Sequence, residues 1–253
     1  MLDRRTVLKG AGALPLAAVL ADPVLAAAVA GSLPEVTITT AGGRQVSAAL
    51  ALPATTPAPA VLLIHEWWGL NDQIKAVAAE LANQGYVALA VDLMGGEVAT
   101  TPDGARALTQ AVKPAEATDT LVSWISWLRS HEKTTGKVAT MGWCFGGGWS
   151  FNASAATPVD ATVIYYGRVP GDVSAVATVE SPVLGHFATQ DKFIDKPMVD
   201  AFSQAMEKAG KRLTVHWYEA DHAFANPTGA RYDEADAKLA WERTAAFLSE
   251  TLR

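Results

Sequence analysis

Three side chains in this sequence have the types that covalent acyl transfer requires, and they occur in the order Cys144, Asp191, His222. A thiol attacks a carbonyl carbon well when an imidazole accepts its proton, and a carboxylate holds that imidazole in the required tautomer. Each of the three residues lies just beyond a predicted strand, where side chains from neighbouring strands meet. The pattern therefore predicts nucleophilic catalysis by Cys144, with His222 as the base and Asp191 as its orienting partner.

Cys144 lies in the stretch Gly142-Trp143-Cys144-Phe145-Gly146-Gly147-Gly148, which follows an apolar run and precedes a helix-compatible segment. A sharp turn from strand to helix pushes the side chain at its apex out of the sheet and points nearby backbone N–H groups at the same place. The glycines leave room for such a turn. A helix N-terminus and a neighbouring imidazolium predict a lowered thiol pKa. The alternative is a buried, inert cysteine in a glycine-rich loop.

Other polar residues compete for places at the predicted site. Glu66 and Asp92 also follow predicted strands, and Asp195 and Asp221 are alternatives to Asp191. Glu66 could compete for the thiol proton, or it could be an ion-paired loop residue. The remaining histidines lie in or beside strands or in a polar turn, and we interpret them as structural: His65, His131, His186 and His216.

Short β-rich runs alternate with amphipathic segments from residue 35 onward. A hairpin precedes a continuous apolar run at 60–65, which is typical of a central strand buried on both faces. Further strands are predicted at 86–91, 137–141, 161–166, 182–188 and 213–218. Six helices are predicted, with boundaries set by capping residues, prolines and glycines. They are a helix at 71–83, one that begins at Pro102, one that begins at Pro114, one that runs from the Cys144 turn to about residue 156, and two at 197–209 and 231–252.

This alternation predicts an α/β fold in which helices cover both faces of one mostly parallel sheet. No repeat, linker or charge block divides the series, so one domain is predicted at 31–253. Half of the residues are apolar and 18% are charged, which is typical of a globular domain with a large core. The net charge of −6 and the lack of a basic cluster beyond the N-terminus argue against a nucleic-acid partner. The sequence indicates no oligomeric state.

Residues 1–30 have the layout of an export signal. Arg4 and Arg5 precede an apolar, alanine-rich run, and small residues that suit cleavage occupy 25–30. The arginine pair resembles a twin-arginine signal, with Val7 where phenylalanine is more usual. We therefore predict a signal peptide at 1–30, a periplasmic location and no stable membrane span after its removal. An uncleaved anchor or a frayed helix is the alternative.

Several of these motifs together resemble the dienelactone hydrolase family. They are the Gly-x-Cys-x-Gly-Gly turn at 142–147, Glu66 ahead of Trp-Trp-Gly-Leu-Asn at 67–71, Gln190-Asp191, and His-Trp-Tyr at 216–218 ahead of His222-Ala-Phe. The resemblance runs from about residue 60 to the C-terminus. It implies an α/β-hydrolase fold without a lid domain and hydrolysis of esters or lactones with no cofactor or metal.

The same resemblance assigns roles to individual residues. It implies that Cys144 is the nucleophile, that His222 and Asp191 complete the triad, and that Glu66 contacts the thiol in the resting enzyme. The backbone N–H groups of Phe145 and Trp67 would bind the oxyanion. Two further residues are predicted in the substrate pocket, Trp68 and Asn226, although Trp67 and Trp68 could instead simply cover the end of the strand.

A sulfur nucleophile also restricts the substrate. A tetrahedral intermediate expels whichever of its groups is the weaker base. A thiol has a reference pKa of about 8.5, whereas simple alcohols lie near the ~15.7 of water, so the thiolate leaves more readily than a simple alkoxide. Activated esters and enol lactones are therefore favoured. Members of the resembled family hold a substrate carboxylate with arginines, but neither 92–96 nor 222–226 contains one. A neutral or bulkier substrate is predicted, and Arg168 or Arg231 could substitute only if the fold brings it near.

Three other functions fit the same residues. A broad carboxylesterase or thioesterase would use the same triad on other acyl compounds. A non-catalytic binding protein would use the pocket beneath Trp67 and Trp68. A thiol-redox role for Cys144 is disfavoured because the chain has no second cysteine to resolve an oxidised form.

Overall fold

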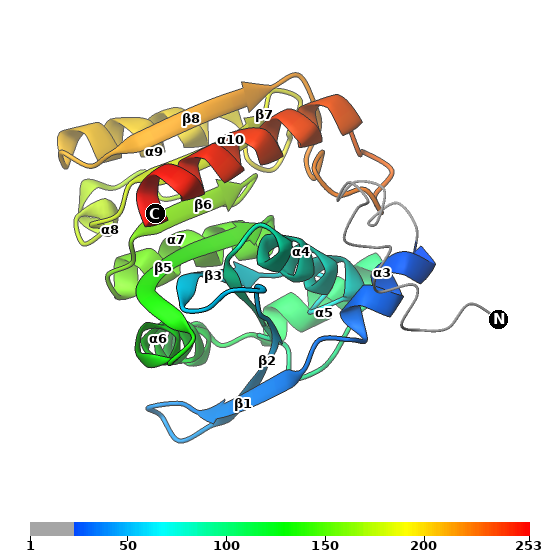
Figure 1. Ribbon diagram of the computed structural model, residues 1–253. Coiled ribbons are helices and arrows are strands. Elements are labelled where there is room, and N and C mark those ends of the chain that lie inside the picture. Colours follow the sequence, from blue (N-terminus) through cyan, green and yellow to red (C-terminus); the bar gives the residue numbers. More distant parts are fainter. Residues whose placement is uncertain (1–22) are drawn as a thin grey trace.

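The computed structural model describes residues 23–253, in which one sheet of eight strands is covered by helices on both faces (Figure 1). The strand order is β1-β2-β4-β3-β5-β6-β7-β8. β1 and β2 pair antiparallel, as do β2 and β4, and all other neighbouring strands are parallel. The predicted single α/β domain with a mostly parallel sheet is confirmed. The predicted twin-arginine motif at Arg4 and Arg5 lies outside the described residues.

The strands coincide closely with the predicted runs, because apolar stretches of this length are buried on both faces of the sheet. The bounds are β1 Glu35–Thr39, β2 Gln45–Ala51, β3 Ala58–Ile64, β4 Val87–Val91, β5 Thr134–Trp143, β6 Ala161–Tyr165, β7 Val183–Ala188 and β8 Leu213–Tyr218. β5 begins three residues earlier than predicted, in the polar segment where Thr134 pairs with Ala58 of β3.

Most helices also begin and end where capping residues and prolines indicated. Their bounds are α3 Pro23–Ala30, α4 Asp72–Asn83, α5 Pro102–Ala111, α6 Pro114–Ser130, α7 Phe145–Ala156, α8 Val173–Val176, α9 Lys196–Lys208 and α10 Glu234–Leu252. The prediction that the last helix starts at Arg231 was wrong, because Asp233 caps α10 by accepting a hydrogen bond from the Asp236 N–H at 3.0 Å. α3 and α8 were not predicted.

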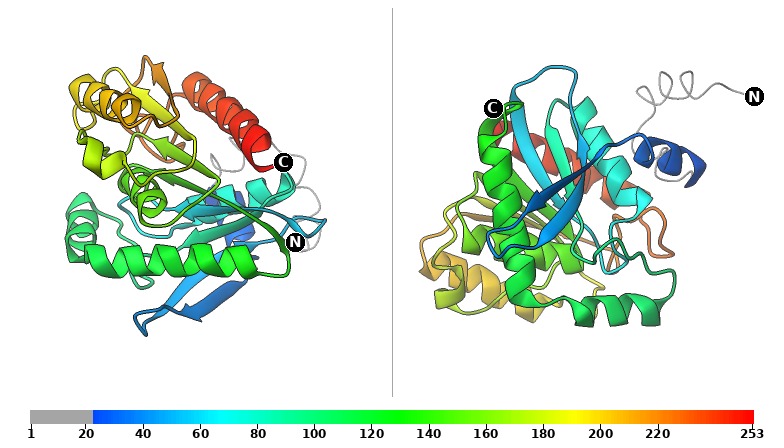
Figure 2. Two further views of the ribbon diagram at one scale, coloured as in Figure 1. Left: turned by 90° about the vertical axis from the view of Figure 1, so that its left-hand side faces the viewer. Right: turned by 90° about the horizontal axis from the view of Figure 1, so that it is seen from below.

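The two faces of the sheet carry separate cores. α4 and α10 cover one face, where alternate residues of the central strand such as Val61 and Leu63 are buried. α6, α7 and α9 lie on the other face (Figure 2). There α6 and α7 pack with residues such as Leu62 and Ile64, and α9 packs with Ile164 and Phe187. α3 packs against α4, and its Ala26 is buried in the first core.

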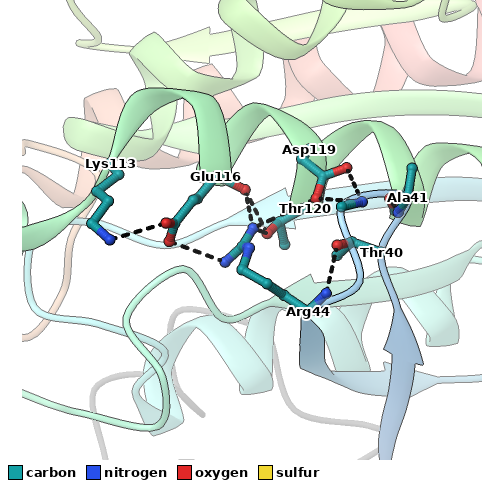
Figure 3. Close-up of polar contacts among 9 residues, drawn as sticks. Thr40, Ala41, Arg44, Lys113, Glu116, Asp119 and Thr120 are labelled. Atoms are coloured by element: carbon teal, nitrogen blue, oxygen red, sulfur yellow. Dashed lines mark hydrogen bonds and ion pairs between the residues drawn. The ribbon is translucent and has the colours of Figure 1, made fainter.

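The turn between β1 and β2 is fastened to α6 by charged and polar groups (Figure 3). The Arg44 guanidinium donates to the Thr120 hydroxyl at 2.9 Å and to the Glu116 carbonyl, and it lies 3.5 Å from the Glu116 carboxylate. The Asp119 carboxylate accepts the Gly42 N–H at 3.2 Å. These contacts hold the outer hairpin at the sheet edge, away from the ends of β5, β7 and β8. No helix in the described part of the chain is long and apolar enough to cross a membrane.

Candidate active site

Cys144 occupies the apex of the turn between β5 and α7. Its backbone has φ 52° and ψ −114°, a left-handed conformation that is unfavourable for a residue with a side chain. Two glycines make the turn possible: a Cβ at Gly142 would lie 2.0 Å from the Gly146 carbonyl oxygen, and one at Gly146 would lie 2.2 Å from the Ile64 carbonyl oxygen. The fold therefore places the thiol beside the end of β3.

The structure brings Cys144, His222 and Asp191 together at the carboxyl ends of β5, β8 and β7. His222 Nε2 lies 3.2 Å from Cys144 Sγ, and His222 Nδ1 lies 2.6 Å from Asp191 Oδ2. The other oxygen, Asp191 Oδ1, accepts the N–H groups of Phe193 at 2.7 Å and Ile194 at 3.0 Å. The carboxylate is thus fixed from both sides, and it can hold the imidazole with its Nε2 directed at the thiol.

The alternatives to Asp191 have other partners. Asp195 caps α9 by accepting the Met198 N–H at 3.0 Å, and Asp221 accepts the backbone N–H of His222 at 2.7 Å. Burial alone would raise the pKa of Asp191. Hydrogen bonds from His222, Ile194 and Phe193 outweigh this effect and lower the pKa of the carboxyl. Asp191 therefore remains ionised beside the imidazole.

The prediction of a lowered thiol pKa is wrong for this resting arrangement. Burial, and after it the nearby Glu66 carboxylate, raise the pKa of Cys144 to about 12, although the Phe145 N–H acts in the opposite direction. A protonated thiol follows at neutral pH. The geometry therefore suits transfer of the thiol proton to His222 by general-base catalysis rather than a preformed thiolate.

Glu66 lies at the end of β3 with partners other than the expected thiol. Its Oε1 accepts the Tyr166 hydroxyl at 3.3 Å, and its Oε2 accepts the Asn226 amide at 2.5 Å. Burial is the main cause that raises the pKa of Glu66, whereas the Asn226 hydrogen bond lowers it. Glu66 therefore acts on Cys144 through its charge, and the hydrogen-bond partner of the thiol is His222.

Asn226, which was expected in the substrate pocket, is buried and holds Glu66. Its Oδ1 accepts the N–H of Thr228 at 2.9 Å and the Thr228 hydroxyl at 2.7 Å, so the direction of its amide is fixed. Trp68 and Trp67 are half-buried, with ring centroids 4.9 Å apart. Of these residues, only the two tryptophans retain surface that a substrate can reach.

The two expected oxyanion donors lie on neighbouring segments. Phe145 is the first residue of α7, and its N–H has no acceptor within the helix. In the described part of the chain, no backbone carbonyl accepts the N–H of either Phe145 or Trp67. The Phe145 N–H interacts with the Cys144 sulfur instead, at the place where the oxygen of a substrate under attack would lie.

Two residues that line the site were missed. Tyr166 was placed within a strand, although it follows the end of β6, and its ring lies 5.2 Å from the His222 ring in an edge contact. Phe193 follows Asp191 by two positions; it is 62% exposed, with its ring 5.4 Å from that of His222. The signal for Tyr166 was its position at a strand end. Nothing in the local spacing indicated Phe193.

Arg231 is the arginine that the fold brings within electrostatic reach. Its positive charge lowers the pKa of both Glu66 and Cys144, although burial dominates both shifts. Arg231 is exposed, in the loop between Asn226 and α10. No group of three or more His, Cys, Asp or Glu side chains suited to a metal ion occurs within residues 23–253.

Most of the chain is similar in sequence to known proteins. The sequence profile of the dienelactone hydrolase family matches residues 46–252. A carboxymethylenebutenolidase from Pseudomonas putida is 33% identical over 218 residues, covering 82% of this chain and 92% of the relative. Carboxymethylenebutenolidase 1 from Cupriavidus pinatubonensis is 28% identical over 226 residues, covering 85% and 95%.

Solved structures show the same fold. A dienelactone hydrolase-like promiscuous phosphotriesterase from metagenomic libraries superposes with a TM-score of 0.79 at 22% identity, covering 87% of this chain and 99% of the other. An esterase from Thermogutta terrifontis gives a TM-score of 0.64 at 18% identity, covering 87% and 95%.

Proposed function

The chain belongs to the dienelactone hydrolase family, and we propose that it hydrolyses activated carboxylic esters or lactones with a Cys144-His222-Asp191 triad. One observation carries this proposal: the continuous path from thiol to imidazole to carboxylate, with contacts of 3.2 and 2.6 Å, at the carboxyl ends of β5, β8 and β7. The carboxymethylenebutenolidase names of its relatives support the lactone class.

In the proposed mechanism, Cys144 Sγ attacks the acyl carbon while His222 Nε2 takes the thiol proton. The oxyanion accepts hydrogen bonds from the Phe145 and Trp67 N–H groups, which contribute about 3 kcal/mol each if they behave like other such donors. His222 then gives its proton to the leaving oxygen as the C–O bond breaks. Water attacks the thioester with His222 as base, and the acid leaves as the thiol is restored.

The surroundings of the triad favour an apolar substrate. The exposed Phe193 has its ring against the edge of His222, and the half-buried Trp67 and Trp68 directly follow Glu66 at the end of β3. Asn226 occupies the neighbourhood where an arginine would bind a substrate carboxylate, and its amide is bound to Glu66. Arg231, exposed and within electrostatic reach, is the residue that would favour an acidic substrate instead.

The experiment compares wild type with Cys144→Ala and His222→Ala on phenyl acetate, an enol lactone, a thioester and ethyl acetate. We expect the wild type to turn over the first three far faster than ethyl acetate, and each variant to lose at least about 10³-fold in kcat. Wild-type turnover in both variants would refute the triad. Preference for the thioester would favour a thioesterase, and ligand retention without turnover would favour a binding protein.

We also propose that the protein is exported to the periplasm by its N-terminal segment. Ala26 and Ala30 of α3 are buried against the domain. Cleavage ahead of Val24 would remove only the first residue of this helix, Pro23, whereas cleavage within 25–30 would remove part of its packing. Sequencing the N-terminus of the secreted protein tests both the export and the position of the cut.

A further inference from the structure

His65, interpreted from sequence as structural, has both ring nitrogens bonded to backbone groups beside the active site. It follows β3 and is fully buried. Nδ1 lies 2.6 Å from the Glu66 carbonyl oxygen, and Nε2 lies 3.2 Å from the Leu93 nitrogen. A carbonyl only accepts and a backbone N–H only donates, so the ring is neutral with its proton on Nδ1.

The bond to the Glu66 carbonyl fixes the peptide between Glu66 and Trp67. A peptide unit is planar and trans, so its C=O and N–H point in opposite directions. Holding the Glu66 carbonyl therefore sets the direction of the Trp67 N–H, one of the two oxyanion donors of the proposed mechanism. The other bond to this carbonyl, from the Gly69 N–H, is longer at 3.4 Å, so His65 is the closer anchor.

His65 also contacts the segment that carries the second donor. Its ring stacks on that of Phe145, with centroids 5.9 Å apart and an interplanar angle of 17°. A Cβ at Gly146 would lie 2.5 Å from the His65 carbonyl oxygen, so the start of α7 packs directly on this residue. One buried residue thus touches both segments from which the oxyanion donors project.

We propose that His65 is a positioning residue that aims the Trp67 N–H and supports Phe145 at the oxyanion site. This inference rests on the proposed function, because it concerns the donors of that mechanism. His65 does not meet the substrate. Its second bond, from the Leu93 N–H, ties the peptide to the loop after β4, and the same loop binds Trp68 through the Ala99 N–H at 2.9 Å.

The proposal distinguishes two replacements of similar size. His65→Leu fills the space but leaves the Leu93 N–H without its partner in a dry site and the Glu66 carbonyl with only the longer bond from Gly69, so the peptide is held less firmly. His65→Gln supplies one amide donor and one carbonyl acceptor on the same side chain, and it can satisfy both backbone groups.

The experiment measures kcat and KM on phenyl acetate and the rate at which iodoacetamide alkylates Cys144. Alkylation forms the S–C bond and expels iodide without an oxyanion. For His65→Leu we expect kcat to fall about 10²- to 10³-fold, with KM within about threefold and alkylation within about twofold of wild type. His65→Gln should recover kcat to within about tenfold. Unchanged kcat in a folded leucine variant, or no recovery with glutamine, would overturn the proposal.

A readout independent of turnover separates this inference from the proposed function. The Trp67 backbone amide signal in ¹H–¹⁵N spectra should move in His65→Leu and return in His65→Gln. If wild type shows no Cys144-dependent turnover, the proposed function fails, while the spectra still decide whether His65 holds this peptide. Should His65→Leu not fold, His65→Asn replaces it, since its shorter amide reaches only one of the two partners.

Discussion

Two buried histidines on the same side of the sheet, His222 and His186, have both ring nitrogens bonded, yet only one is suited to chemistry. His222 lies between the Asp191 carboxylate and the Cys144 thiol, at 2.6 and 3.2 Å. His186 lies within β7 between two hydroxyls, those of Tyr218 at 2.7 Å and Thr244 at 2.9 Å.

The partners account for the difference. A carboxylate stabilises the imidazolium that forms when His222 takes a proton, whereas hydroxyls carry no charge to do so. Burial holds the pKa of His186 well below its ordinary value, and electrostatic interaction with His216 and Arg243 lowers it further. A bonded histidine is therefore suited to proton transfer only when its partners can change or balance charge.

Replacing one partner of each histidine is the strongest test of this contrast. Asp191→Asn should lower kcat by about 10⁴-fold, because the imidazole loses both its tautomer and its counter-charge. Thr244→Val, which removes a hydroxyl from His186, should leave kcat within about twofold and reduce the free energy of unfolding by about 1–3 kcal/mol. Ester kinetics and urea unfolding measure both. A large kcat loss in Thr244→Val would erase the distinction.

The pH dependence of the free energy of unfolding provides a second test of the contrast between His186 and His222. His186 is neutral when folded but binds a proton in the unfolded chain below pH ~6.5. Its lowered pKa therefore makes the free energy of unfolding rise with pH below that value, by about 1.4 kcal/mol per pH unit. Urea unfolding from pH 7 to 5 should show this slope, and His186→Gln should reduce it. Parallel slopes for the two proteins would contradict the assignment.

The smallest expected effect concerns the influence of the Glu66 charge on the pKa of Cys144, the thiol beside His222. Burial first, and then Glu66, raises the pKa of Cys144. Glu66→Gln should therefore shift the pH profile of iodoacetamide alkylation to lower pH. At a given pH below the thiol pKa, the reaction should become about tenfold faster for each unit by which that pKa falls. Glu80→Gln, which makes the same charge change on α4, is the matched control. Equal shifts in both variants would show a general charge effect.

The sequence was sufficient for the sheet, the turn at Cys144 and the convergence of three strand-end residues, because strand periodicity and chain order determine them. It was insufficient for the partners of Glu66. Tyr166 and Asn226 lie 100 and 160 positions away, and local spacing does not encode such packing. The expected thiol pKa was wrong for the same reason, since the argument counted the helix terminus and the imidazole but not the burial of the sulfur.

Backbone strain in the described residues has one location. The three residues other than glycine with positive φ are Cys144, Tyr166 and Ala223, and each lies in the site or next to its histidine. Such conformations cost about 1–3 kcal/mol each and persist only while the surroundings enforce them. On gradual heating, the turn at Cys144 should relax before the sheet separates, so ester turnover should decline several degrees below the melting of the domain.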